Sequence, residues 1–334
     1  MSTTATREGR SPGEPSTTPP FGTRARRFFR AHPAAFAAIL TVVMLVVNIA
    51  MQPQFGPVQQ LAAFAPLALA AMATAAAVIG GGIDLSISAQ MTLSSILLTG
   101  YFTPVGLGGY VAIPILIMIG ALVGALNGLI AVVLRLPPIV ASLASMFILT
   151  GINLRLAPTP VILFDGWVLD LAKQVWFVPG SILTIGLPLA GWYLLVRGAY
   201  GRNLYAVGGN DTTAFSAGVH VNLVRVVSYA VGGAIAAVGG IALTALVSSA
   251  DASSSSSYVI GAITAIALGG ISMMGGRGGM LGAVAGAAVI FLVQNMLTLF
   301  GVSQVWLNLV FGALLLFAVI IGAVMAAPRK EKHA

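Results

Sequence analysis

Residues 198–226 read GAYGRNLYAVGGNDTTAFSAGVHVNLVRV and form the longest polar interruption between apolar segments of the chain. The apolar blocks on either side are long enough to cross a lipid bilayer. Within the polar segment, residues 211–217 have the potential to form a short helix. We interpret residues 198–226 as a platform outside the bilayer, which a cytosolic partner grips if the platform faces the cytosol.

The composition is that of a membrane protein. Of the 334 residues, 58% are hydrophobic and only 7% are charged, whereas a soluble domain normally carries about a quarter charged residues. A chain so poor in charge cannot cover a soluble surface, so most of its surroundings must be lipid. The apolar runs are continuous and longer than the roughly ten-residue alternating segments of a β-barrel. The sequence therefore predicts an all-α polytopic membrane protein.

The apolar runs predict about ten transmembrane helices, each close to the roughly twenty residues that a span requires. They cover residues 33–51, 58–79, 85–102, 111–134, 139–156, 179–196, 227–247, 258–272, 280–300 and 304–325.

The basic residues provide a separate test of this topology. If the helices alternate from a cytosolic N-terminus, every Lys and Arg except Arg155 and Lys173 lies on the cytosolic side, as the positive-inside rule expects. We therefore expect both termini and the platform in the cytosol. The predicted organisation is a disordered basic tail at residues 1–32, a membrane domain at 33–326 that contains the platform at 198–226, and a C-terminal tail at 327–334.

Two segments are expected on the outer face. Residues 157–178 are aromatic and partly polar, with Trp167 and Trp176 suited to the membrane interface. We expect this segment to lie on the membrane surface and to form part of an external docking face. The serine run at residues 253–257 has the composition of a flexible linker.

A glycine-rich break, IGGGIDLS at residues 79–86, separates the second and third spans. Asp84 has two compatible interpretations: an N-cap of the next helix, or part of a broken membrane helix that lines a cavity. A similar string, LGGISMMGGRGG, occurs at residues 268–279. The shared GGID and GGIS hint at two related halves.

Small and polar residues inside the spans indicate packing and a possible path. Glycines at 120, 124 and 128, and at 282 and 286, form close-packing stripes, either within one subunit or across a dimer. The amides in the spans either bond neighbouring helices or line a polar path that suits an uncharged polyol. The predicted pathway residues are Asp84, Asn127, Gln294 and Asn295.

Several chemistries are excluded by counting. The three lysines lie outside any G-x-x-x-x-G-K-[ST] phosphate loop, so we expect no ATP hydrolysis by that route and no enzyme activity in this chain. The sequence has no cysteine, and its three histidines lie in tails or loops. We expect no cofactor, no metal and no nucleic-acid partner. A proton or sodium relay built of several carboxylates is also missing.

Three motifs resemble a known family over nearly the whole chain. IGGGIDLSISAQMTLS at 79–94, GRNLYAVGGNDTTAFSAGVHV at 201–221 and AIALGGISMMGGRGG at 265–279 are similar to the permease subunits of bacterial ABC importers for ribose and related monosaccharides. The resemblance implies a multi-pass protein of the bacterial plasma membrane. It also implies a second permease, two cytosolic ATP-hydrolysing subunits and an extracytoplasmic sugar-binding protein.

In that family the segment matching residues 209–219 is a cytoplasmic coupling helix that docks into the ATPase. The resemblance assigns this contact to Gly209, Asn210, Asp211, Ala214, Phe215, Gly218 and Val219. Phe215 departs from the usual polar or basic pattern. It either anchors in a cleft of the ATPase or packs on the membrane helices of its own chain.

The sequence thus favours a permease subunit that imports a neutral monosaccharide or similar polyol. A branched-chain amino-acid permease of the related ABC group is the second interpretation, although a zwitterion calls for polar groups at both of its ends. A self-sufficient secondary transporter and a membrane scaffold without transport activity are the alternatives from other classes.

Overall fold

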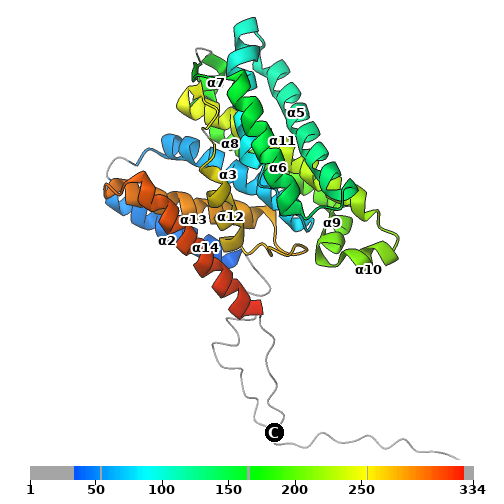
Figure 1. Cartoon of the computed structure of the whole chain (residues 1–334). Coiled ribbons are helices and arrows are strands. Elements are labelled where there is room, and N and C mark those ends of the chain that lie inside the picture. Colours follow the sequence, from blue (N-terminus) through cyan, green and yellow to red (C-terminus); the bar gives the residue numbers. More distant parts are fainter. Residues whose placement is uncertain (1–33, 53–54, 164–165, 254, 327–334) are drawn as a thin grey trace, which may run out of the picture.

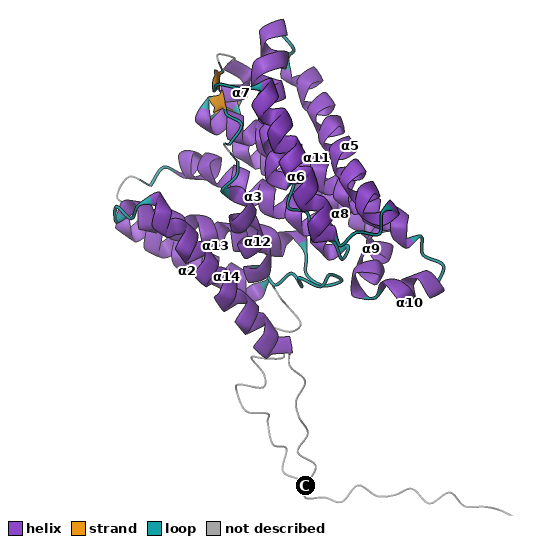
Figure 2. Cartoon of the chain, in the orientation of Figure 1, coloured by secondary structure: helices purple, strands orange, loops and turns teal. Residues whose placement is uncertain are grey.

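Helices dominate the computed structural model, which describes residues 34–52, 55–163, 166–253 and 255–326 (Figure 1 and Figure 2). The predicted tails at 1–32 and 327–334 lie outside the described residues. Every predicted span coincides with a helix. These are α2 (Ala35–Met51), α3 (Pro57–Ile79), α4 (Ile87–Leu97) with the π-helical turn η1 (Leu98–Phe102), α5 (Gly109–Val133), α6 (Pro138–Leu156), α8 (Gly180–Arg197), α11 (Val221–Val247), α12 (Tyr258–Leu268), α13 (Met280–Leu299) and α14 (Gln304–Ala326).

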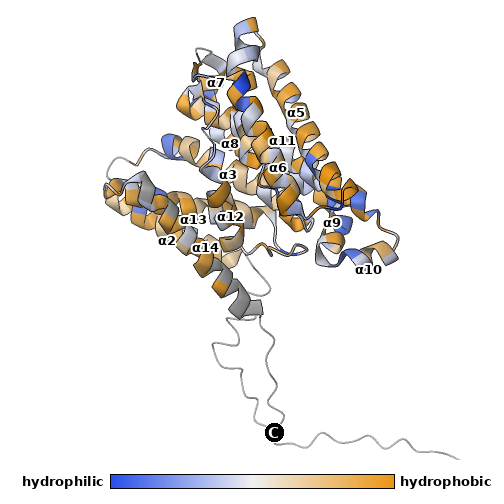
Figure 3. Ribbon diagram, in the orientation of Figure 1, coloured by the Kyte–Doolittle hydropathy of each residue, from blue (hydrophilic) through white to orange (hydrophobic). Residues whose placement is uncertain are grey.

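Six helices of the described chain are long and apolar enough to cross a membrane: α3, α5, α6, α8, α11 and α13. Their exposed side chains are largely apolar, as lipid-facing surfaces require, and Figure 3 shows hydrophobic colour along most of the helices. This confirms a polytopic membrane protein.

The remaining elements are short and connect the long helices. They are η2 (Thr103–Val105), α7 (Gly166–Asp170), α9 (Ala199–Gly209) and α10 (Asp211–Ser216), with strands β1 (Val161–Ile162), β2 (Gln174–Val175), β3 (Val178–Pro179) and β4 (Ser249–Ala250). Antiparallel pairs join β1 to β4 and β2 to β3. The all-α prediction is therefore right for the membrane helices, whereas the predicted outer segment at 157–178 contains three two-residue strands and a short helix.

The core is built around α3 and α11. From Ala65 to Ile79 every residue of α3 is buried, and most of these residues are alanines, whose small side chains let neighbouring backbones come close. Helix α11 packs against α3, α4 and α5. Helix α13 packs against α2 and α12, and α14 packs against α12. Both α12 and α13 also contact α3.

The glycine stripes pack within the chain. A Cβ built on Gly124 would lie 2.2 Å from the carbonyl oxygen of Tyr229 on α11. A Cβ on Gly286 would lie 1.9 Å from the carbonyl oxygen of Ala265 on α12. Backbones therefore touch directly at both crossings, and the stripes serve the subunit's own packing.

Two helix ends differ from the prediction. Helix α11 begins at Val221, six residues before the predicted start at 227, because Val224 turns inward while polar Asn222 remains on the exposed face. Helix α12 ends at Leu268 rather than at 272, because the glycines that follow close it.

The helices α3 and α12 end in the same way, at the GGID and GGIS strings. Gly81 and Gly270 have φ of 81° and 76°. The next amide donates back five residues in each case, from Gly82 to Ala77 and from Ile271 to Ile266, both at 3.0 Å. This is the hydrogen-bond pattern of a left-handed helix C-cap.

The serine run is not a free linker where the structure describes it. Ser255 is fully buried, and its hydroxyl bonds the Thr92 hydroxyl and the Ser88 carbonyl on α4. Helix α12 has only 11 residues, about 16 Å at the α-helical rise, against a hydrocarbon core of about 30 Å. The chain before α12 therefore runs deep alongside α4.

Candidate functional site: a coupling surface and a polar interior

The platform predicted at 198–226 consists of α9, α10 and the first turns of α11. Asn210 separates helices α9 and α10, because its backbone is extended, with φ of −162° and ψ of 107°. Its side-chain oxygen accepts from the Thr213 amide at 2.9 Å and from the Thr212 hydroxyl at 2.7 Å. Asn210 therefore acts as the N-cap of α10, and the predicted short helix forms at Asp211–Ser216.

Two kinds of contact hold α10 against the membrane helices. Ala214 is only 4% exposed and belongs to the hydrophobic core, and half-buried Val219 packs against the same core. Asp211 forms an ion pair with Arg225 on α11, with 2.9 Å between Oδ2 and Nη2. Both charged side chains are partly exposed, so this pair orients α10 more than it stabilises the fold.

The opposite face of α10 is open. Phe215 is 73% exposed, so the interpretation that it packs on the membrane helices of its own chain is wrong. Gly209, Asn210 and Gly218 are exposed as well, and Gly218 ends the helix with φ of 82°. The surface therefore presents one large apolar side chain among small and polar residues, next to the hydrophilic colour around α9 and α10 in Figure 3.

Asp84 organises a buried polar cluster at the break between α3 and α4. It is 2% exposed, and its Oδ1 accepts from the Ser86 amide at 2.9 Å and from the Ser86 hydroxyl at 2.6 Å. These bonds close a local turn two residues long. The prediction that Asp84 is the N-cap of the next helix is wrong. Ser86 occupies the N-cap position of α4, and its side chain makes no cap hydrogen bond.

Asn127 joins this cluster from α5. Its amide donates to Asp84 Oδ1 at 2.9 Å, and its own oxygen accepts from the Ser145 hydroxyl of α6 at 2.9 Å. Gln90 donates to the Ser86 hydroxyl at 2.8 Å. Residues from the break and from α4, α5 and α6 thus form one hydrogen-bonded cluster around Asp84, and two predicted pathway residues are neighbours in it.

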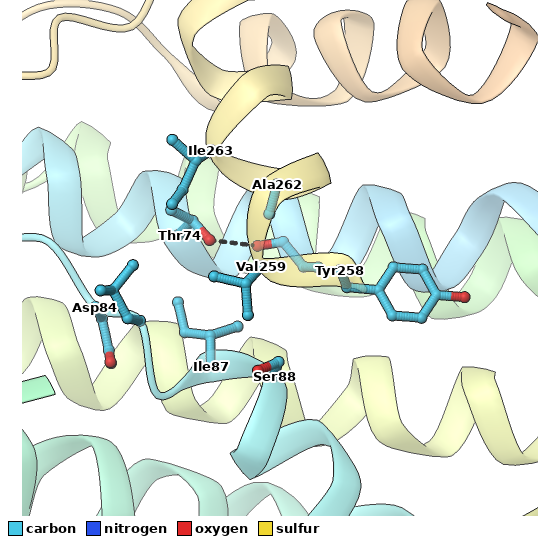
Figure 4. Close-up of a pocket in the computed structure, with 10 residues that line it drawn as sticks. Thr74, Asp84, Ile87, Ser88, Tyr258, Val259, Ala262 and Ile263 are labelled. Carbon is cyan, nitrogen blue, oxygen red and sulfur yellow. Dashed lines mark hydrogen bonds between the residues drawn. The ribbon is translucent and has the colours of Figure 1, made fainter. Parts of the chain in front are cut away.

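A small cavity of about 10 Å³ lies beside Asp84, between α3, α4 and α12, which is room for about one water molecule. Figure 4 shows Ile87 next to Val259 of α12 and Thr74 next to Ile263 of α12, with Asp84 to one side of them. The Thr74 hydroxyl is occupied by the Ala70 carbonyl at 2.9 Å. Asp84 Oδ2 has no hydrogen-bond partner among the described residues.

The other two predicted pathway residues lie elsewhere. Asn295 of α13 donates to Asn48 of α2 at 3.3 Å and to Gln60 of α3 at 3.1 Å. Gln294 is half-buried, and within the described chain it joins neither cluster. The structure therefore separates the predicted pathway residues into two polar clusters instead of one path.

Sequence reasoning missed several members of these clusters. Gln90, Asn48 and Gln60 carry the same signal as the predicted amides, a hydrogen-bonding side chain inside an apolar run, and that signal was available. Ser86 and Ser145 carry no such signal. A larger cleft, of about 460 Å³ between α5, α8 and α11, has an almost wholly apolar lining.

Removing the Asp84 side chain should destabilise the protein, whereas neutralising it should not. Asp84→Ala leaves two donors of Ser86 and one of Asn127 without their acceptor, at about 1–3 kcal/mol for each unsatisfied group. Asp84→Asn keeps Oδ1 and removes a buried carboxylate that has no basic partner among the described residues. We expect thermal unfolding in detergent to show a lower Tm for the alanine variant only. A Tm equally low for Asp84→Asn would contradict this account.

Comparison with known proteins gives consistent matches over most of the chain. The model of a family described as branched-chain amino acid transport system / permease component matches residues 56–319. The chain is 32% identical over 288 residues to the ribose import permease of Bacillus subtilis, covering 85% of this chain and 89% of that protein. It is 34% identical over 303 residues to the autoinducer 2 import system permease of Klebsiella pneumoniae, covering 86% and 85%. It is 28% identical over 322 residues to the fructose import permease of Rhizobium meliloti, covering 89% and 87%. No solved structure gives a significant match.

Proposed function

The chain belongs to the family of permease components described for branched-chain amino acid transport systems, and from this premise we propose that it imports a neutral monosaccharide or similar polyol. It is a membrane permease subunit of an ABC importer. A separate ATPase subunit drives the transport, and an extracytoplasmic binding protein delivers the solute. The names of the similar ribose and fructose permeases support the choice of substrate class.

The observation that carries this choice is the chemistry of the buried polar groups. Apart from the carboxylate of Asp84, the polar clusters in the described spans consist of amides and hydroxyls, which donate to and accept from sugar hydroxyls. The basic side chains of the described chain lie in loops or at helix ends. A substrate carboxylate therefore finds no basic partner inside the spans, which favours a polyol over an amino acid.

The platform is the proposed contact with the ATPase. Phe215, Asn210, Gly209 and Gly218 supply the exposed face of α10, while Asp211, Ala214 and Val219 fix α10 to its own chain. When two ATPase subunits close on nucleotide, their displacement reaches the permease at this face and rocks its helices between two states. A helix that is capped at Asn210 and held on its inner side transmits such a displacement without bending.

We further propose ten membrane crossings with both termini in the cytosol, and a second permease across the transport path. The coincidence of all ten predicted spans with helices supports the first point, together with the placement of basic residues. Helix α12, with 11 residues, reaches across only together with the buried chain that precedes it.

The test is uptake into proteoliposomes that contain the permease, its ATPase and its binding protein. Radiolabelled D-ribose, D-fructose and L-leucine serve as parallel probes. We expect ATP-dependent accumulation of a sugar and none of leucine. Uptake of leucine alone would favour the branched-chain amino-acid alternative that the family description carries. Uptake driven by a proton or sodium gradient without the ATPase would overturn the proposal.

A further inference from the structure

Three glycine-rich segments from distant parts of the chain meet at the end of α9, next to the start of α10. One follows α3 and contains Gly81, the second ends α9 at Gly208 and Gly209, and the third lies between α12 and α13 at Gly275 and Gly276. We name these five glycines the glycine joint. Figure 1 shows the loop between α12 and α13 reaching towards α9.

The three turns touch through their backbones. The Gly276 amide donates to the Ile79 carbonyl at 3.0 Å, which ties the loop after α12 to the end of α3. A Cβ on Gly208 would lie 2.0 Å from the Ile79 oxygen and 2.5 Å from the Gly276 nitrogen. A Cβ on Gly275 would lie 2.8 Å from the Gly81 Cα and from the Gly208 oxygen. Among the described residues, the atoms nearest to both Cβ positions belong to the backbone.

A hydrogen bond at the edge reinforces the joint. The Tyr205 hydroxyl on α9 donates to the Gly278 carbonyl at 3.0 Å. Burial, with a smaller contribution from Tyr193, raises the pKa of Tyr205 above its usual value. The phenol therefore remains a protonated donor at neutral pH, and α9 is held to the loop by a side chain as well as by its backbone.

The position of the joint links α10 to two separate groups of helices. The chain passes from Gly209 through Asn210 directly into α10. The other two turns end α3, the core helix, and lead from α12 into α13. Directly packed backbone has almost no free volume to absorb a displacement. A shift at α10 must therefore move the end of α3 and the loop between α12 and α13 together. Helices α3 and α12 both border the cavity beside Asp84.

We propose that the glycine joint is the positioning element that transmits the displacement of α10 to the α3–α4 break and to the α12–α13 pair at the same time. The proposal rests on the proposed function, in which α10 receives the motion of the ATPase. Simple close packing, the alternative role, would require these glycines for stability but not for coupling.

The decisive variant is Gly208→Ala. The residue is helical, so alanine improves the intrinsic helix propensity, and any harm comes from forcing the three turns apart. Gly186→Ala is the matched control, because Gly186 lies inside α8 and a Cβ there meets nothing within 4 Å. The readout is the amount of radiolabelled sugar imported per ATP hydrolysed in the reconstituted importer, using the sugar that the wild-type protein accumulates.

For Gly208→Ala we expect the ratio of imported sugar to hydrolysed ATP to fall about ten-fold, a factor within the range of allosteric coupling between two sites. ATP hydrolysis should continue in this variant. Gly186→Ala should have the wild-type ratio. An assembled Gly208→Ala importer with the wild-type ratio overturns the proposal. If this variant does not assemble, Tyr205→Phe decides instead. It removes one hydrogen bond, so we expect a ratio about three- to five-fold lower, and an unchanged ratio overturns the proposal.

The controls separate this proposal from the proposed function. If the wild-type protein and Gly186→Ala both fail to couple ATP hydrolysis to uptake, the proposed function fails and this inference falls with it. If both couple normally and the joint variants do so too, only the glycine joint is refuted.

Discussion

Replacing Phe215 with alanine is expected to weaken binding of the ATPase by about 30-fold in Kd, which corresponds to the roughly 2 kcal/mol lost at an interface hot spot. The side chain is 73% exposed on a helix that is otherwise small and polar outside. An aromatic group in that position gains most of its free energy by leaving water for a pocket of the partner. Its removal leaves the fold of the permease unchanged, because Phe215 makes little contact with its own chain.

The measurement is titration of the purified ATPase onto the permease in nanodiscs, followed by sugar uptake with the same variants. Phe147→Ala provides the matched control. Phe147 is 69% exposed, but it lies within the predicted span of α6. We expect this variant to bind the ATPase with the wild-type Kd. Equal Kd values for Phe215→Ala and the wild-type protein would show that the aromatic face of α10 is not the contact.

The second large effect is expected for Gly124→Ala at the crossing of α5 and α11. The new methyl group would lie 2.2 Å from the Tyr229 carbonyl oxygen and 3.2 Å from the Gly233 Cα. Both obstacles are backbone, so neither can rotate away, and the two helices must separate. Overpacking of this kind costs about 1–3 kcal/mol or more, and here it opens the main contact of the core helix α11.

We expect Gly124→Ala to lower the thermal midpoint by several degrees and to reduce the amount of folded protein extracted from membranes. Size-exclusion chromatography after heating gives both quantities. Gly151→Ala in α6 is the control, because a Cβ there meets nothing within 4 Å. Should the two variants melt together, the α5–α11 crossing tolerates more space than its backbone contacts indicate.

The helices could be located from the sequence because a hydrophobic run long enough to cross the bilayer must satisfy its own backbone hydrogen bonds there, which a helix does. Their ends were harder to place. The first turns of α11 were not predicted because they contain the polar residues Asn222 and Arg225. The average hydrophobicity of a segment does not distinguish the exposed polar face of a helix from a loop. The glycines after Leu268 ended α12 early, and that local signal was present in the sequence.

The polar clusters could be predicted only in part. An amide in a span, such as Asn127, demands a partner, but the partner is Asp84, separated by 43 residues. Nothing in the sequence around Asp84 shows that Asn127 bonds Asp84, whereas Asn295 bonds Gln60. The roles assigned to the residues of α10 remain predictions, since they concern a second protein. Burial nevertheless separates the residues that can reach a partner, such as Phe215, from those that cannot, such as Ala214.

Ser255 has a practical consequence for work on the living cell. A polar, serine-rich stretch between two membrane helices is the place where an epitope tag or a fluorescent protein would ordinarily be inserted. Here the hydroxyl of Ser255 is hydrogen-bonded to the Thr92 hydroxyl and to the Ser88 carbonyl. Added residues would therefore displace the chain from its packed position beside α4. Reporters belong instead in the exposed turn at residues 104–106, with Gly106 itself retained because its φ is 74°.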